Sequence, residues 1–182
     1  MGLSRAALVL GLLVASGCAR ELVLSPYGSA TAVARNDDGS VWKRDRLHDG
    51  ADIRVDRNGG VALAAADGVV GFVRTDACAG LMISVAHPGT GFWTHYVHLS
   101  SATVRAGQRV TRGQVLGEVG IFPCSGGVRH VHFQLCSSFD CGGPGPMGST
   151  QDPVPWIVGC YHEGTAYADP ARPFVLTYPV EC

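Results

Sequence analysis

The sequence has almost no net charge and only one lysine, Lys43. Its 14 Lys and Arg residues are balanced by 15 Asp and Glu residues, which leaves a net charge of −1 over 182 residues. A protein that binds nucleic acid or anionic membranes through a general electrostatic attraction carries an excess of basic residues. The composition therefore excludes nucleic acid as an expected partner.

The sequence also lacks heptads, repeats of fixed period and amphipathic helical stripes longer than two turns. Glycine is abundant instead, with 25 residues, and short apolar stretches alternate with glycine turns. This pattern is typical of strands joined by tight turns. We expect an all-β fold, a small antiparallel β-sandwich or partly open barrel. Within it, Asp67-Gly68 predicts a two-residue hairpin, and a second hairpin is expected around residues 88–91.

The first eighteen residues are typical of an export signal. Arg5 is followed by a ten-residue apolar run, residues 6–15, which is too short to span a bilayer as a helix. The "ASGC" that ends at Cys18 resembles the lipobox of bacterial lipoproteins. We therefore expect an exported protein with a lipid anchor on Cys18 as its membrane attachment. Ordinary signal-peptidase cleavage nearby, giving a secreted or periplasmic protein, is the alternative.

No Cys-x-x-Cys pair is present, which argues against a cysteine zinc knuckle. Removal or lipidation of Cys18 leaves six of the seven cysteines, an even number that predicts three disulfides in an exported domain. Proximity along the chain suggests the pairs Cys136–Cys141 and Cys160–Cys182, which leaves Cys78 to pair with Cys124. Residues 137–182 then form a disulfide-stapled C-terminal extension.

Two pairs of candidate metal ligands stand out. His130 and His132 share one face of an expected strand, opposite Val131, and His48 and Asp52 are four residues apart. Imidazole and carboxylate suit Zn²⁺, and a hydrolytic zinc site uses three protein ligands and one open position. Strict alternation also sets Tyr96 and His98 on one face of another strand. The candidates for one site are His48, Asp52, His98, His130 and His132.

The order of these motifs, His48-x-x-x-Asp52, Tyr96-x-His98-Leu99 and His130-x-His132, resembles the lysostaphin-type (LytM-like) zinc metallopeptidases. The resemblance covers residues 45–136, after an N-terminal segment of residues 19–44. It implies Zn²⁺ held by His48, Asp52 and His132, with His98 and His130 as catalytic residues. Tyr96 is a candidate for a further catalytic donor, and an aromatic side chain packed on the sheet is the alternative for it. The implied activity is an exported endopeptidase that hydrolyses peptide cross-links of bacterial peptidoglycan.

Three other functions deserve comparison. A non-catalytic protein of the same fold could bind the cell wall or activate another hydrolase, although every motif residue is present here. A lipoyl or biotin carrier needs a lysine in a hairpin, and Lys43 is not in the glycine-spaced region of residues 104–120. A cysteine peptidase using Cys124 and His130 would leave the zinc motifs unexplained. His87 and His95 are expected to be structural.

Overall fold

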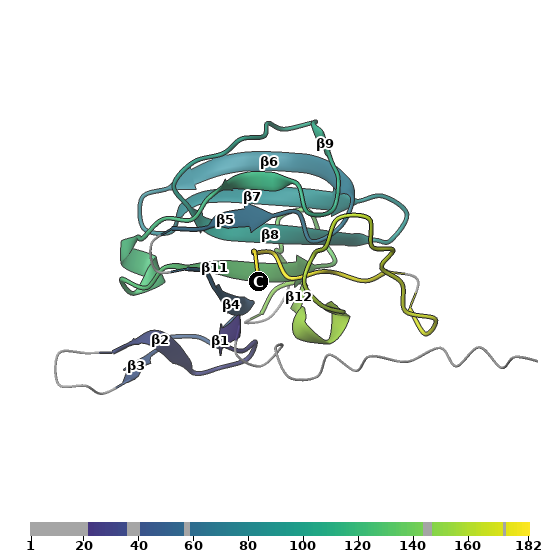
Figure 1. Cartoon of the computed structure of the whole chain (residues 1–182). Coiled ribbons are helices and arrows are strands. Elements are labelled where there is room, and N and C mark those ends of the chain that lie inside the picture. Colours follow the sequence, from purple (N-terminus) through teal and green to yellow (C-terminus); the bar gives the residue numbers. More distant parts are fainter. Residues whose placement is uncertain (1–21, 36–40, 57–58, 144–146, 173) are drawn as a thin grey trace, which may run out of the picture.

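The computed structural model describes residues 22–35, 41–56, 59–143, 147–172 and 174–182 (Figure 1). The expected export signal and Cys18 lie outside these residues. Within the described part of the chain, no helix has the length and apolar character needed to cross a membrane. The elements that lie wholly within the described residues are strands and two short 3₁₀ helices, η1 (Pro123–Ser125) and η2 (Val154–Trp156).

An eight-stranded antiparallel sheet forms the larger layer of the molecule (Figure 1). Seven strands follow one another in the order β1-β4-β11-β8-β7-β6-β9, and β12 pairs with β11 beside this path. In that order, their bounds are β1 (Val23–Ser25), β4 (Ala51–Arg54), β11 (His130–Cys136), β8 (Phe92–Leu99), β7 (Gly80–His87), β6 (Gly68–Asp76), β9 (Arg109–Val110) and β12 (Thr150–Gln151). The hairpin expected around residues 88–91 is confirmed as β7–β8.

Two smaller antiparallel pairs complete the strands. β5 (Val61–Leu63) pairs with β10 (Val115–Glu118) and lies over the large sheet, while β2 (Thr31–Arg35) pairs with β3 (Val41–Lys43) and extends below β1 and β4 (Figure 1). The C-terminal segment runs along β5, where Ala62 bridges Val180. The sheets do not close into a barrel, so the expected all-β, sandwich-like fold is confirmed.

The hairpin expected at Asp67-Gly68 is wrong, because β5 and β6 belong to different sheets. Asp67 lies where the chain passes from one layer to the other. Its carboxylate accepts a hydrogen bond from the backbone N–H of Arg112 at 2.7 Å, and its carbonyl oxygen lies 2.8 Å from His87 Nδ1. These distant partners hold the turn in a layer-crossing conformation instead of a hairpin.

The core lies between the two layers and includes residues far apart in the sequence. On β11, Val131, Phe133 and Leu135 are completely buried, as alternation predicts. The C-terminal segment adds Leu176 and Tyr178 to the same cluster. Burial of each such side chain contributes about 1.5–3 kcal/mol, so residues 174–180 stabilise the strands that carry the site.

The three expected disulfides are confirmed. The bonded pairs are Cys78–Cys124, Cys136–Cys141 and Cys160–Cys182. The first joins the β6–β7 turn to η1, the second closes a short loop after β11, and the third ties the C-terminus to the segment after η2. Cys124 therefore has no free thiol, which removes the cysteine peptidase from consideration.

Candidate functional site

Three expected metal ligands converge at the pairing of β4 with β11. Antiparallel register sets Asp52 directly opposite His132, and His48 lies just before β4. His48 Nε2 lies 2.9 Å from His132 Nδ1 and 3.0 Å from Asp52 Oδ1. His132 Nδ1 lies 3.0 Å from the same carboxylate oxygen. The structure thus brings together two side chains that are about 80 residues apart in the sequence.

The two histidines expected to act in catalysis face the same point. His130 Nε2 lies 3.3 Å from Asp52 Oδ1. The ring of His98 is 4.9 Å from that of His130 and 6.1 Å from that of His132, measured between centroids. His98 and His130 are both buried. Four imidazoles therefore surround one carboxylate.

His98 reaches this point through a β-bulge. Leu81 pairs with Leu99 and Ile83 pairs with Tyr96, so two residues of β8 oppose one residue of β7. His98 has a φ of +70°, a conformation that few non-glycine residues adopt. A bulge of this kind re-aims a side chain and often lies beside an active site. Here it turns His98 to the side of the sheet where His130 and His132 lie.

The expectation that Tyr96 and His98 share a face is wrong, because the bulge interrupts the alternation between them. Tyr96 is completely buried in the core. Its hydroxyl oxygen lies 2.8 Å from the Ala65 nitrogen, which donates to it, and 3.0 Å from Thr94 Oγ1. Burial raises the pKa of Tyr96 to about 12. The structure therefore does not bring Tyr96 to the other site residues.

The outward nitrogens of three imidazoles are held by backbone carbonyls. A carbonyl oxygen only accepts hydrogen bonds, so the ring nitrogen that faces it carries the hydrogen. In a neutral ring, the other nitrogen then has a lone pair directed to the centre of the site. The three contacts join His48 Nδ1 to Pro26 O at 2.9 Å, His98 Nδ1 to Ala79 O at 2.8 Å and His130 Nδ1 to Val128 O at 2.9 Å.

Two charged residues that the sequence patterns did not identify complete the surroundings. Asp49 Oδ1 lies 3.3 Å from His132 Nε2, on the outer side of that ring. Arg44 Nη2 lies 2.8 Å from Asp52 Oδ2, the carboxylate oxygen that faces away from the histidines. Asp49 is within the His48–Asp52 motif, so a search for second carboxylates would have found it. No sequence signal connects Arg44 with Asp52.

These contacts shift the pKa values in the metal-free site. Burial alone would raise the pKa of Asp52, but its contacts with the imidazoles of His130, His132 and His48 outweigh it and hold the pKa well below its usual range. Burial would lower the pKa of His132, yet the carboxylates of Asp49 and Asp52 raise it to about 9. The pKa of Asp49 falls to about 2, because its hydrogen bond with His132 outweighs the effect of burial.

His98 shifts in the opposite direction from His132. Burial, reinforced by the neighbouring His130, lowers the pKa of His98 to about 4. The ring is therefore neutral at pH 7. A neutral imidazole with one nitrogen already donating can accept a proton at the other, which is the state that a general base requires.

The donor atoms fit a zinc ion. His48 Nε2, Asp52 Oδ1 and His132 Nδ1 all lie within 4.8 Å of one another. Three acceptor atoms this close repel one another unless a proton or a cation lies between them, and in the metal-free site the proton on His132 meets this need. Two imidazoles and one carboxylate are an established ligand set for catalytic zinc, with the fourth position left for water or substrate.

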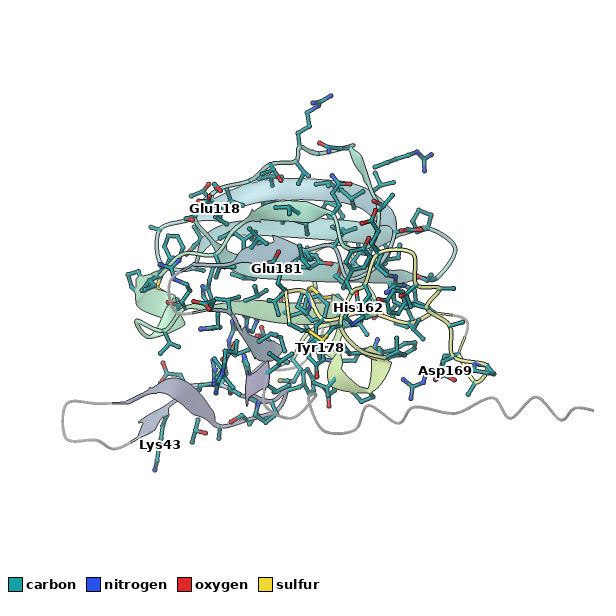
Figure 2. All side chains as sticks on the ribbon, viewed as in Figure 1. Lys43, Glu118, His162, Asp169, Tyr178 and Glu181 are labelled. Carbon is teal, nitrogen blue, oxygen red and sulfur yellow. A yellow bond between two sulfur atoms is a disulfide. The ribbon has the colours of Figure 1, made fainter. Side chains whose placement is uncertain are left out.

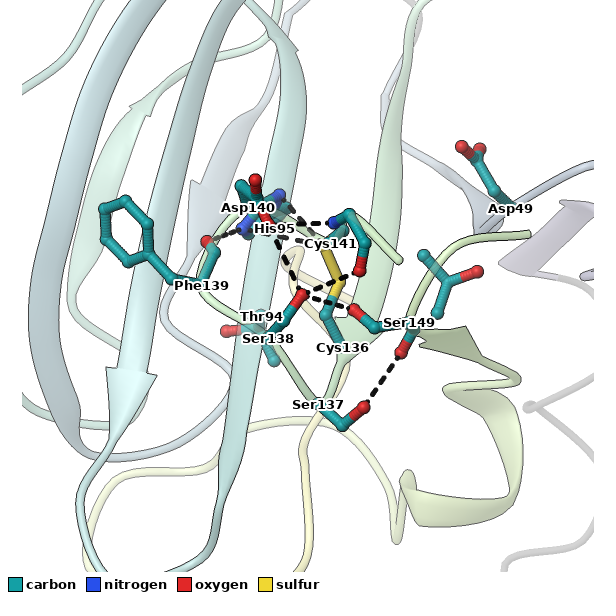
Figure 3. Close-up of a disulfide and its surroundings, with 12 residues drawn as sticks. Asp49, Thr94, His95, Cys136, Ser137, Ser138, Phe139, Asp140, Cys141 and Ser149 are labelled. Carbon is teal, nitrogen blue, oxygen red and sulfur yellow. Dashed lines mark hydrogen bonds between the residues drawn. A yellow bond between two sulfur atoms is a disulfide. The ribbon is translucent and has the colours of Figure 1, made fainter. Parts of the chain in front are cut away.

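A cleft with a volume of about 810 Å³ lies over these residues. One wall comes from residues 43–49, and another comes from residues 140–142 in the loop that follows β11. Figure 3 shows that loop closed by Cys136–Cys141 and fastened to β8 by His95, whose Nε2 lies 3.1 Å from the carbonyl oxygen of Phe139. The cleft is large enough for a short peptide.

The remaining histidines lie outside the group of four. His95 lies on the cleft side of β8, but its Nδ1 is 3.2 Å from Cys141 Sγ, a contact that holds the loop against β8. The two sulfurs beside it are bonded to each other, so they are not available as metal ligands. His87 Nε2 lies 2.9 Å from Thr94 Oγ1 in the core. His162 is exposed near the C-terminal segment (Figure 2).

Known proteins share this sequence pattern and this fold. The model of peptidase family M23 matches residues 46–143, just over half of the chain. The peptidoglycan DD-endopeptidase ShyA of Vibrio cholerae serotype O1 is 35% identical over 97 residues, which are 52% of this chain and 21% of the relative. The chain thus aligns with about a fifth of that protein's length.

Two solved structures share the fold at low sequence identity. The catalytic domain of lysostaphin from Staphylococcus simulans superposes with a TM-score of 0.56 and 23% identity, over 75% of this chain and 92% of that one. A structure from the complex of SpoIIIAH and SpoIIQ superposes with a TM-score of 0.55 and 22% identity, over 74% of this chain and 91% of that one. At these identities, the similarity extends to the fold alone.

Proposed function

The chain belongs to peptidase family M23, and on this premise we propose that it is a zinc metalloendopeptidase that hydrolyses peptide cross-links of bacterial peptidoglycan. The observation that supports this best is the convergence of His48 Nε2, Asp52 Oδ1 and His132 Nδ1, which lie 2.9–3.0 Å apart. These three residues would hold the zinc. The cleft above them is open to a peptide.

The residues around the three proposed ligands suggest separate catalytic roles for His98 and His130. Bound zinc supplies Lewis-acid chemistry, which polarises a carbonyl oxygen and acidifies water. His98 Nε2 would accept the proton of the attacking water, because burial keeps this imidazole neutral. In its protonated form, His130 would donate a hydrogen bond from Nε2, which faces the site, to the oxygen on which negative charge develops. Their backbone acceptors, Ala79 and Val128, keep both rings in the required orientation.

The competing function is a non-catalytic protein of the same fold that binds cell-wall peptides or another protein. The similarity to a structure from the SpoIIIAH–SpoIIQ complex motivates it, because that fold takes part in an assembly between proteins. The arrangement of His98 and His130 favours catalysis, since metal binding alone requires neither. A binding protein would retain affinity for peptidoglycan but release no new peptide ends.

Digestion of purified peptidoglycans that differ in cross-link chemistry tests the proposal. The zinc-loaded protein should release soluble fragments, and mass spectrometry should identify a new amino end and a new carboxyl end at one type of peptide bond. His130→Ala provides the matched control, because it retains all three proposed ligands. Release of glycan fragments with intact cross-links, or equal release by this variant, would contradict the proposed chemistry.

We also propose that the protein acts outside the cytoplasm, anchored through Cys18. Its expected substrate lies there, and three disulfides suit an oxidising compartment. Multiple acyl chains hold a protein stably at a membrane, whereas a single chain does not. Cys18→Ser should move the protein from the membrane fraction to the soluble fraction without changing its zinc content. A wild-type protein that is already soluble would contradict the anchor.

A further inference from the structure

Arg44 makes the closest charged contact to the proposed metal ligand Asp52. Its Nη2 lies 2.8 Å from Asp52 Oδ2, a distance typical of a charge-assisted hydrogen bond. Asp52 is 1% exposed, so water competes little for this contact. Arg44 precedes residues 46–143, the part of the chain that matches the family. The contact is therefore made by a segment outside that match.

The two oxygens of Asp52 have separate partners. Oδ1 faces His48 and His132 at 3.0 Å each, while Oδ2 faces Arg44. A carboxylate whose second oxygen is taken by a guanidinium offers a metal only one oxygen. The separate partners of the two oxygens therefore favour binding of a metal through Oδ1 alone.

Backbone contacts fix Arg44 in this position. Its Nε donates to the carbonyl oxygen of Thr31 at 3.2 Å, and its main-chain nitrogen donates to the carbonyl oxygen of Ala30 at 2.9 Å. Thr31 is the first residue of β2, and Ala30 directly precedes it. Because the guanidinium is planar and its donors are fixed relative to one another, holding Nε also holds Nη2. The side chain is 23% exposed and lines the cleft.

We propose that Arg44 is a positioning residue that keeps Asp52 a one-oxygen ligand and so preserves the open coordination position for water. This inference rests on the proposed function. If Oδ2 were free, the carboxylate could rotate or bind through both oxygens and occupy the position that hydrolysis requires. Partners behind a metal ligand orient it, and their loss typically costs about 10- to 100-fold in metal affinity or activity.

Three variants of the full-length protein test the role of Arg44. Arg44→Met removes the guanidinium but keeps most of the side-chain length, and Arg44→Lys restores the charge without the fork of donors. Arg109→Met is the matched control, because it removes the same guanidinium at a position outside the cleft. Arg109 is exposed on β9, which lies at the opposite edge of the large sheet from β1.

Zinc affinity, measured by competition with a chelator, is the first readout. We expect Arg44→Met to bind zinc about 10-fold more weakly or worse, Arg44→Lys to recover part of the loss, and Arg109→Met to match the wild type. The visible spectrum of the Co²⁺-loaded protein is the second readout. Its intensity falls when coordination number rises, so Arg44→Met should absorb more weakly per bound ion.

The outcomes separate this inference from the proposed function. Unchanged affinity and an unchanged Co²⁺ spectrum in Arg44→Met would overturn the role of Arg44. If a thermal melt shows that Arg44→Met does not fold, Arg44→Lys decides, and wild-type affinity together with a wild-type spectrum in that variant would overturn the role equally. A wild-type protein that binds no zinc would instead contradict the proposed function.

Discussion

Gly50 lies against β11 and the ring of His132, and Gly50→Ala should displace that ring. A Cβ at this position would lie 2.6 Å from the carbonyl oxygen of Phe133 and 2.9 Å from two atoms of the His132 ring. The carbonyl belongs to β11 and cannot move without breaking the sheet, so the imidazole must shift. Overpacking of this kind costs about 1–3 kcal/mol, which lowers the Tm of a protein of this size by about 2–4 °C per kcal/mol.

The consequence for the metal should exceed the consequence for stability. Because His132 Nδ1 lies only 3.0 Å from Asp52 Oδ1, even a small shift of the ring separates two of the three proposed ligands. Calorimetric melting and chelator competition should show a modest loss of Tm with a clear loss of zinc affinity. Gly60→Ala is the control, since its Cβ would press on the side chain of Val55 at 2.8 Å, away from the cleft. Equal zinc affinity in the two variants would refute this reasoning.

Three further predictions concern catalysis, pH and the disulfides. His98→Ala should retain zinc but lose about 10²-fold or more in turnover, measured by release of soluble peptide, and near-normal turnover would contradict its role. The pKa of His132 in the metal-free site is about 9, above its ordinary 6.5. Protonation of His132 therefore stabilises the folded metal-free protein fully below about pH 6.5, and this stabilisation is lost as the pH rises through 9. Zinc must displace this proton, so its affinity in chelator competition should rise about tenfold per pH unit from 7 to 9 and then level off, and a pH-independent affinity would refute the assignment. Replacing Cys78 and Cys124 together by serine should lower kcat in zinc-loaded protein more than the same change at the Cys160–Cys182 bridge. The reason is that Cys78 is next to Ala79, whose carbonyl oxygen orients His98. Equal effects on kcat would contradict this coupling.

Much of the fold and most of the site could be predicted from local patterns. Alternation along β11 correctly separates His130 and His132 from the buried Val131 and Phe133. Proximity along the chain correctly pairs Cys136 with Cys141 and Cys160 with Cys182, and Cys78 and Cys124 are the pair that remains. The alternation holds because β11 is a regular strand, and the Cys136–Cys141 pair holds because only five residues separate the two cysteines.

Other features could not be predicted, because they depend on contacts between distant segments. The bulge in β8 arises from its register with β7, and it separates Tyr96 from His98 where regular alternation would have joined them. Arg44 meets Asp52 only because the β2–β3 pair lies beside β4. The acceptor of His48 is Pro26, from a segment with no motif of its own. Local sequence patterns do not encode such partners.

The central claim is that one zinc ion, held by His48, Asp52 and His132, enables this chain to hydrolyse peptidoglycan cross-links. Titration of the metal-free protein with zinc, while soluble peptide is released from purified peptidoglycan, tests it most directly. Hydrolysis should be absent at the start, rise in proportion to added zinc and level off at about one equivalent. Asp52→Ala should show no such rise. Full hydrolysis in the presence of excess chelator, or tight binding of one zinc with no bond cleaved, would contradict the account.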